Sequence, residues 1–433
     1  MVSPLLSLHD EQVSTFRNEF GLKATAINSS NGGCTREIMD QVVAGEWQIV
    51  MLSPEMLVSR RFIDGVLRKP AFGSRCLSVY IDEAHCVSHW GASFRKKYAS
   101  IGIIRAFLPR TTPIIAVTTT LTPRVHQDLV VKLQFDPKDY IFCSIGNDRP
   151  NVSQVIRSME HAANSYRDLD FLIPAGTNKP GEIKKTFLYT DDIKDGGKTI
   201  DHLNARVPEE YRSRGLVRPY NAGMSRQYRE DVMALFKAGI IRILVCTDAA
   251  GMGCDISDIE LVVQWKAPQN LSSWVQRAGC AARGAGISGM AVMIVEKSAF
   301  ETSPITSGSV DNPVSTVPTR ARGRGRGRGT GGRGGHGKRG GKQGKDYAER
   351  HGQRRDADIP QDAPAEGLYA LIQSMVCRRI ILANVFGNNP PAVSKEACCD
   401  ICNPKLFDGV RPSKSVRAVR QKGIRKGPPS DTV

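Results

Sequence analysis

An apolar run that ends in two acids, Val79-Tyr80-Ile81-Asp82-Glu83, constrains this chain more than any other feature of its sequence. Apolar residues that lead directly into carboxylates are typical of a buried parallel strand whose C-terminal end carries the charged groups of a site. At such an end the aspartate can hold Mg²⁺ on nucleotide phosphates, and the glutamate can orient or deprotonate the attacking water. A surface turn that enters a helix is the alternative interpretation of the same residues.

Short apolar runs recur along residues 1–300, and helical patterns such as residues 225–238 lie between them. Short runs without polar alternation, spaced by helices, indicate parallel sheets that are covered on both faces. The segment 146–151 divides these runs into two halves, so the sequence predicts two α/β units joined there. The predicted strands are residues 49–52, 77–81, 114–117, 186–189, 241–246, 261–265 and 290–295.

Positive charge is concentrated in two segments, whereas the formal net charge of the whole chain is +17. Residues 320–345 hold seven Arg and three Lys with no acid, and residues 411–433 hold seven Lys or Arg against one acid, Asp431. Segments so poor in apolar residues cannot offset the entropy lost on ordering, and we expect them to be disordered. Their charge favours a nucleic-acid partner held by flexible arms, and a solubilising linker and tail is the alternative.

No apolar run is long enough to cross a bilayer, and the N-terminus lacks the basic-then-apolar pattern of a signal peptide. We therefore expect an intracellular, soluble protein whose 11 cysteines are thiols or metal ligands. Cys399-x-x-Cys402 has the spacing of a chelating loop, and Cys377 with Cys398 would complete a tetrahedral zinc site of four thiolates. Four scattered buried thiols are the alternative.

Several segments follow the acidic pair in a fixed order. Asp82-Glu83-Ala84-His85 is followed by an aromatic-rich segment at residues 89–98 and a threonine-rich segment at 116–123. Residues 245–256 then join a strand to small residues and an acid, and residues 276–284 contain Gln276 and Arg283. This order resembles the RecQ-like ATP-dependent DNA helicases of superfamily 2, with their Walker B box, aromatic-rich loop and motifs III, V and VI.

The resemblance implies an α/β fold of two RecA-like parallel-sheet lobes, the first incomplete, plus a small helical zinc-binding subdomain. We expect the partial first lobe at residues 1–146, the second lobe at 147–303 and the zinc-binding subdomain at 367–408. A disordered Arg/Gly-rich insert at 304–366 would separate the last two, and a basic disordered tail would occupy 409–433.

The resemblance also implies the roles of the site residues, with ATP, Mg²⁺ and Zn²⁺ as cofactors. Asp82 would bind magnesium, Glu83 would activate water, and Arg283 would reach across to the transferring phosphate. His85 and Gln276 would couple the two lobes. The residues expected at the nucleotide are Gly251, Gly253, Asp255 and Arg283, and the zinc ligands are Cys377, Cys398, Cys399 and Cys402.

A 3′-to-5′ DNA helicase that acts in recombination and repair, in the nucleus, is the function that this family resemblance implies. Stacking rings beside the acidic pair would let single-stranded DNA signal to the ATPase, although isolated aromatics are often core residues. The Arg-Gly segment would bind single strands, including RNA, without reading sequence. The expected DNA contacts are Ser3, Pro4, Ser53, Trp90, Phe94, Arg95, Thr118, Thr120 and Thr247.

Two departures from the family pattern keep other functions open. Cys280 stands where the family has an arginine, and a thiol cannot form the charge-assisted bonds of a guanidinium. The sequence contains no Gly-x-x-x-x-Gly-Lys-Ser/Thr phosphate loop, and it begins at motif Ia, so we expect a chain truncated before that motif. The alternatives are a catalytically inactive nucleic-acid-binding paralogue and an Arg-Gly RNA-binding scaffold.

Overall fold

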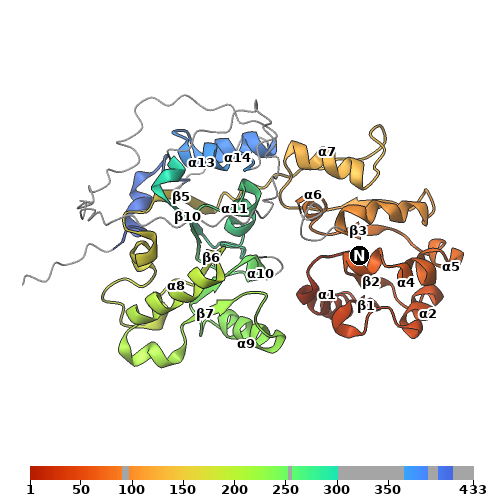
Figure 1. The fold of residues 1–433 in the computed structure, drawn as a ribbon, viewed down its shortest axis with the longest axis horizontal. Coiled ribbons are helices and arrows are strands. Elements are labelled where there is room, and N and C mark those ends of the chain that lie inside the picture. Colours follow the sequence, from red (N-terminus) through yellow and green to blue (C-terminus); the bar gives the residue numbers. More distant parts are fainter. Residues whose placement is uncertain (90–96, 252–255, 301–364, 389–397, 413–433) are drawn as a thin grey trace, which may run out of the picture.

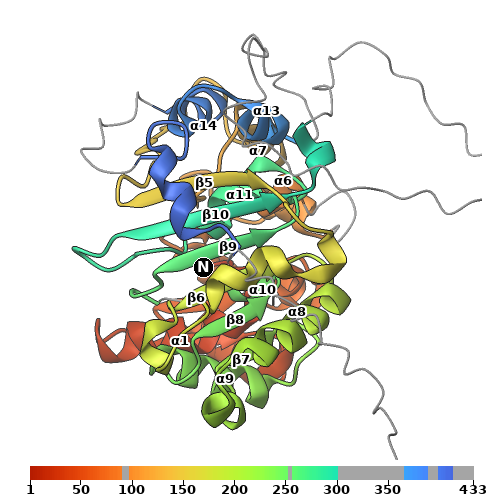
Figure 2. The same ribbon diagram turned by 90° about the vertical axis from the view of Figure 1, so that its left-hand side faces the viewer.

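Two α/β lobes and a helical C-terminal element make up the computed structural model, which describes residues 1–89, 97–251, 256–300, 365–388 and 398–412. Figure 1 shows lobe 1 (residues 1–133) in red to orange beside lobe 2 (residues 151–300) in yellow to green. The C-terminal element (residues 365–388 and 398–412) lies against lobe 2, with its helices above β5 in both views (Figures 1 and 2). The expected aromatic-rich loop, most of the Arg/Gly-rich insert and most of the basic tail lie outside the described residues.

Lobe 1 divides its strands between two parallel pairs. β1 (Ala24–Ile27) pairs with β2 (Ile49–Leu52), and β3 (Val79–Ile81) pairs with β4 (Ile114–Ala116). Val2 forms a bridge to Leu52 on one side and to Ile81 on the other, so it joins the two pairs. The helices are α1 (Leu6–Asn18), α2 (Arg36–Ala44), α3 (Pro54–Leu57), α4 (Arg60–Phe62), α5 (Pro70–Gly73), α6 (His85–His89) and α7 (Pro123–Lys132).

Lobe 2 is built on one six-stranded parallel sheet with the strand order β5-β10-β9-β6-β8-β7. Phe187 and Tyr189 of β6 pack toward α9 and α11, whereas Leu188 packs toward α8, so both faces are covered. The strands are β5 (Val152–Ser158), β6 (Thr186–Thr190), β7 (Val217–Tyr220), β8 (Ile243–Cys246), β9 (Leu261–Trp265) and β10 (Gly289–Val295). The helices are α8 (Ile193–Arg206), α9 (Arg226–Lys237), α10 (Asp248–Gly251) and α11 (Leu271–Ala278).

Local sequence explains where the main helices begin. The Ser225 hydroxyl accepts a hydrogen bond from the Tyr228 amide, which caps α9 and confirms the helix predicted over residues 225–238. Thr122 caps α7 in the same way, and Pro123 follows at the first helical position, where its missing N–H costs nothing. None of the helices in the described part of the chain is long and apolar enough to span a membrane.

Three strands, β1, β5 and β7, are absent from the strands predicted by sequence. β5 and β7 are the two edges of the lobe 2 sheet, and edge strands tolerate the polar residues and the proline that these segments contain. Both therefore lack the continuous apolar run that marks the central strands. β1 consists of Ala, Thr, Ala and Ile, whose small and polar side chains do not form a strong apolar run.

The C-terminal element contains α13 (Leu368–Gln373) and α14 (Arg378–Phe386). Cys377 lies between the two helices and directly precedes α14. The Arg378 guanidinium explains the break, since it donates to the carbonyls of Leu371, Ile372 and Ser374 that α13 leaves open. Ordered structure also continues past the predicted tail boundary at residue 409, because Val410 is buried against lobe 2.

Candidate active site

The acidic pair lies directly after β3, as the sequence predicts. The amide of Asp82 donates to Val2 O at 2.8 Å, and the Tyr98 hydroxyl donates to Asp82 O at 3.0 Å. The Ser3 hydroxyl lies 3.5 Å from Asp82 Oδ2. Glu83 adopts a left-handed φ of 46°, which is costly for a residue with a side chain and requires surrounding contacts to hold it.

Glu83 sits in a buried, poorly hydrogen-bonded position. Its Oε2 lies 3.3 Å from His85 Nδ1, but that nitrogen is 2.9 Å from the Thr118 hydroxyl, and Glu83 Oε2 has no hydrogen-bond donor among the described residues. Burial, and then the charge of Asp82, raise the pKa of Glu83 to about 7, although the charge of Arg283 lowers it. Burial also raises the pKa of Asp82. The lack of a donor to Glu83 Oε2 suits a base that is active near neutral pH, and the adjacent Asp82 carboxylate, which accepts from the Glu83 amide and from Ser3, could hold a cation.

Arg283 approaches this pair from lobe 2. It follows the turn after α11, where its Nε donates to Gly279 O at 3.4 Å and its Nη2 lies 3.6 Å from Cys280 Sγ. Its charge is among the causes that set the pKa of Glu83, so the guanidinium and the carboxylate act on each other across the two lobes. The fold thus places Glu83 and Arg283, two hundred residues apart in sequence, close enough for the charge of Arg283 to lower the pKa of Glu83.

The Cys280 side chain lies beside the Arg283 guanidinium and also belongs to the interior of lobe 2. Its side chain is buried, and the Tyr189 hydroxyl lies 3.6 Å from its Sγ. Cys280 also belongs to the apolar cluster of lobe 2. The position where the family has an arginine therefore faces the lobe 2 core in this chain.

Arg277 is a buried residue that sequence reasoning missed. Its Nη2 lies 2.7 Å from both Asp191 Oδ1 and Asp248 Oδ1, and its Nη1 donates to Gln264 Oε1 at 2.6 Å. These contacts tie α11 to the ends of β6, β8 and β9. The available signal was an arginine on the otherwise apolar face of a short helix. By contrast, Gln276, which the sequence singles out, is half-buried on the same helix.

The residues expected to contact DNA are only partly accessible. Ser53 caps α3 by accepting from the Met56 amide, and its side chain is 3% exposed. Ser3 and Thr120 are buried as well, and Thr118 is bonded to His85. The predicted site residues Trp90, Phe94, Arg95, Gly253 and Asp255 lie outside the described residues. Pro4, Thr247 and the backbone of Gly251 are described, but their contacts do not indicate a ligand.

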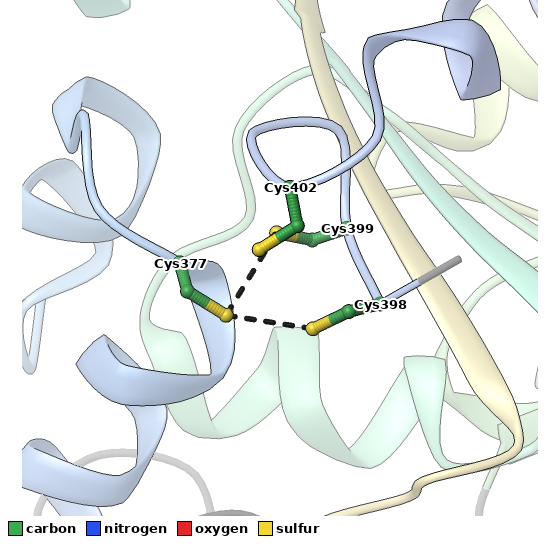
Figure 3. A group of neighbouring side chains, drawn as sticks. All are labelled: Cys377, Cys398, Cys399 and Cys402. Carbon is green, nitrogen blue, oxygen red and sulfur yellow. Dashed lines mark hydrogen bonds between the residues drawn. The ribbon is translucent and has the colours of Figure 1, made fainter. Parts of the chain in front are cut away.

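The four predicted zinc ligands gather in the C-terminal element (Figure 3). Their sulfur atoms all lie within 4.8 Å of one another, with 3.4 Å between Cys377 and Cys398 and 3.6 Å between Cys399 and Cys402. A tetrahedral zinc ion with Zn–S bonds of about 2.3 Å separates its sulfurs by about 3.8 Å, so the cluster fits such an ion. Burial and the neighbouring sulfurs raise the pKa of Cys402 to about 12, which a bound cation would reverse.

Comparison with known proteins identifies both lobes. Residues 1–129 match the family model of the DEAD/DEAH box helicase, and residues 179–285 match that of the helicase conserved C-terminal domain. The chain is 25% identical over 423 residues to the ATP-dependent DNA helicase RecQ of Haemophilus influenzae, covering 96% of this chain and 56% of that protein. It is 30% identical over 295 residues to the ATP-dependent helicase wrn-1 of Caenorhabditis elegans, covering 65% of this chain and 25% of that protein.

Solved structures agree on the fold. Dbp5 of S. cerevisiae bound to RNA and ADP BeF3 superposes with a TM-score of 0.51 at 15% identity, over 68% of this chain and 70% of that one. The helicase MrfA bound to DNA and AMPPNP gives 0.53 at 18% identity, over 70% of this chain and 42% of that one. The chain spans about half the length of the first RecQ relatives, at 56%, 44% and 55% of each. By its motif order and these relatives, the chain is similar to the RecQ-like helicases of superfamily 2.

Proposed function

We propose that this chain is the motor portion of an ATP-dependent DNA helicase that moves 3′ to 5′ along one strand, as its RecQ-like relatives suggest. The observation that carries the proposal is that Glu83, at the end of β3 in lobe 1, lies close enough to Arg283 of lobe 2 for the arginine charge to lower the Glu83 pKa. A base and a guanidinium contributed by separate lobes let nucleotide hydrolysis depend on how the lobes are arranged. His85 and Gln276 would sense that arrangement from either side.

Asp82 and Glu83 are the residues that would hold and use a magnesium-bound triphosphate. Bound Mg²⁺ would neutralise phosphate charge and orient the nucleotide. Glu83, with its pKa near 7, would accept a proton from the attacking water, and Arg283 would stabilise charge that develops on the phosphate. Gly251, Gly253 and Asp255 complete the proposed nucleotide contacts.

Nucleic acid is the proposed substrate of both the lobes and the Arg-Gly segment. The RecQ-like relatives are named as DNA helicases, and Ser3, Pro4, Ser53, Thr118, Thr120 and Thr247 remain the proposed contacts with Trp90, Phe94 and Arg95. RNA binding by residues 320–345 belongs to the same proposal. The proposal also includes a role in recombination and repair and a location in the nucleus. Relatives of similar sequence include proteins of bacteria, which are cells without a nucleus.

A nucleic-acid-binding protein without motor activity is the second candidate. It is favoured by Cys280, which stands where the family has an arginine and is buried in lobe 2. An Arg-Gly RNA-binding scaffold that keeps the helicase fold is a variant of this candidate. The experiments below separate the three.

The first experiment measures ATP hydrolysis by the full chain with and without single-stranded DNA. We expect DNA to stimulate hydrolysis, and we expect Arg283→Ala to lower kcat about 10³-fold, as loss of an arginine finger does. Glu83→Gln should lower kcat similarly, because it removes the base. Arg36→Ala, whose side chain is 92% exposed on α2, is the matched control. Hydrolysis that is absent, or unaffected by DNA, favours the second candidate.

The second experiment compares binding of single-stranded DNA and RNA by the full chain and by a variant lacking residues 320–345. If residues 320–345 serve only to tether nucleic acid to a motor, the deletion variant should still hydrolyse ATP in response to DNA. Its binding of nucleic acid should be weaker and less dependent on salt. If RNA competes fully with DNA, and all binding disappears with the segment, the scaffold interpretation holds instead.

A further inference from the structure

Arg149 organises the turn that carries Arg283. Its Nη1 donates to Gly279 O at 2.7 Å, and its Nη2 donates to Ala281 O and to Ala282 O, each at 2.9 Å. Residues 279–282, here called the finger turn, lie between the end of α11 and Arg283. One guanidinium thus satisfies three carbonyls of the finger turn, which only the fork of an arginine can do.

The backbone of the finger turn needs such external support. Ala282 has a left-handed φ of 47°, which is unfavourable for a residue with a Cβ and persists only where surrounding contacts hold it. Asn151 supplies a second contact, since its Nδ2 donates to Ala282 O and to Ile287 O, each at 2.8 Å. Both supports come from residues 149–151, the segment that joins the two lobes.

The joining segment is in turn held by the C-terminal element. Arg379, which is 2% exposed, donates through Nη2 to Arg149 O at 3.0 Å and to Pro150 O at 3.1 Å. Its Nη1 pairs with Asp148 Oδ2 at 3.1 Å. Arg379 lies in the first turn of α14, two residues after Cys377. A continuous series of bonds therefore runs from the cysteine cluster through Arg379 and Arg149 to the finger turn.

We propose that Arg149 is a positioning residue for Arg283, and that Arg379 links its placement to the state of the four-cysteine cluster. Arg149 does not touch the nucleotide in this scheme. It shapes the turn from which Arg283 extends, so its effect on hydrolysis rests on the function proposed above. The arrangement of the finger turn does not depend on that function, and a cysteine within the turn allows it to be measured separately.

Cys280 is the reporter of this arrangement, because it lies inside the finger turn and is 1% exposed. We expect its alkylation by iodoacetamide, followed by peptide mass spectrometry on the full chain, to become about tenfold faster in Arg149→Ala as the turn opens locally. Cys246 of β8, also 1% exposed, is the internal control for general unfolding of lobe 2 and should keep its rate. Arg206→Ala is the matched variant, since Arg206 also binds a lobe 2 carbonyl, that of Ile173, away from the finger turn.

The link to the cluster is tested with the same reporter. Arg379→Ala should accelerate Cys280 alkylation by a smaller factor than Arg149→Ala, because Arg149 keeps its own bonds to the turn. Chelation of bound metal should increase the rate of Cys280 alkylation in the unsubstituted chain. In Arg379→Ala the same treatment should change that rate little. Arg149→Lys should give an intermediate rate, and it carries the same test if Arg149→Ala does not fold.

Hydrolysis supplies the second readout. Arg149→Ala should lower kcat roughly ten- to hundredfold while leaving KM for ATP within about twofold, because a misplaced Arg283 affects the transition state more than binding. Unchanged Cys280 alkylation in Arg149→Ala and Arg149→Lys, relative to Cys246, overturns the proposal. An unsubstituted chain that fails to hydrolyse ATP overturns the proposed function instead, and the alkylation result still decides the role of Arg149.

Discussion

Lobe 2 is built on one continuous six-stranded sheet, whereas the described strands of lobe 1 form two separate pairs that are joined through Val2. In lobe 2 the central strands β6, β8 and β9 have no exposed apolar side chain. In lobe 1 Ile115 of β4 is 44% exposed and Val117 is 38% exposed, and β4 pairs on one side only within the described residues. The acidic pair thus belongs to the lobe whose sheet is less completely buried and paired, and Arg283 belongs to the lobe with the continuous, buried sheet.

The contrast shows that site geometry and lobe stability have different origins. Asp82 and Glu83 are held by a few specific bonds from Val2, Ser3 and Tyr98, which do not require a wide sheet. Arg283 is held through buried networks that extend into the C-terminal element. We therefore expect substitutions to affect the two lobes unequally, and the following predictions test that expectation.

Removing Arg378 should have the largest effect, on the side of lobe 2. Arg378 and Asp400 are paired at 2.8 Å with both side chains 0% exposed, and leaving one buried charge alone costs about 3–5 kcal/mol. Urea denaturation of Arg378→Ala should show this loss, with hydrogen exchange rising in α13 and α14. The double variant Arg378→Met/Asp400→Leu should recover most of the stability, and a loss below about 1 kcal/mol in Arg378→Ala would contradict the prediction.

Matched core truncations compare the lobes directly. Leu188→Ala in β6 should lower the free energy of unfolding by about 3–5 kcal/mol, because neighbouring strands and α8 enclose the cavity. Leu52→Ala in β2 should cost about 2–3 kcal/mol, because the divided sheet of lobe 1 can relax around it. Hydrogen exchange of peptides from β6 and β2 would measure each lobe separately. If the two substitutions lower the free energy of unfolding equally, the proposed difference between the lobes is wrong.

Stability should also respond to pH through Glu83. The folded-state pKa of about 7 exceeds the ordinary value of 4.5, so the folded state binds this proton more tightly than the unfolded state. The resulting contribution to the free energy of unfolding is fully present below pH 4.5 and is lost as the pH rises through 7. The change in the free energy of unfolding is on the order of 3 kcal/mol, at about 1.36 kcal/mol per pKa unit. Exchange of lobe 1 peptides in magnesium-free buffer between pH 5 and 8 would measure it, and Glu83→Gln should reduce the slope, leaving the smaller contribution of Asp82.

Contacts between the exposed faces of the lobes should matter least. Arg226 of α9 pairs with Asp10 of α1 at 2.7 Å, but their side chains are 59% and 54% exposed. Such pairs are worth less than about 1 kcal/mol and weaken with salt. A double-mutant cycle of Arg226→Ala and Asp10→Ala in chemical denaturation would measure the coupling. A coupling above about 1.5 kcal/mol would mean that the lobes unfold as one body.

Much of the fold could be predicted where burial is uniform. The central strands β6, β8 and β9 are buried along their whole length and mostly apolar, so the sequence alone predicts them. Edge strands β5 and β7 were not predicted, because Ser, Gln and Arg in β5 and Arg and Pro in β7 interrupt the apolar pattern. The cysteine cluster was predictable because few residue types bind zinc, and their spacing is restricted.

The supporting arginines could not be predicted in the same way. Arg149 and Arg379 look like surface residues in the sequence, and arginine usually is exposed. Their partners are mostly backbone carbonyls, which every residue carries, so no residue type marks where they bind. Only the path of the chain reveals that Arg149 reaches Gly279 and Ala282.

By itself the sequence determined the chemistry of this protein: an acidic pair at the end of a strand, an arginine in a later motif, and four thiols spaced for a metal. It could do so because charge, ligand type and apolar patterning are local properties of the chain. The tertiary structure alone decided which of these groups act on one another and which buried arginines hold them in place. Those relations depend on distances between residues far apart in sequence, which only folding sets.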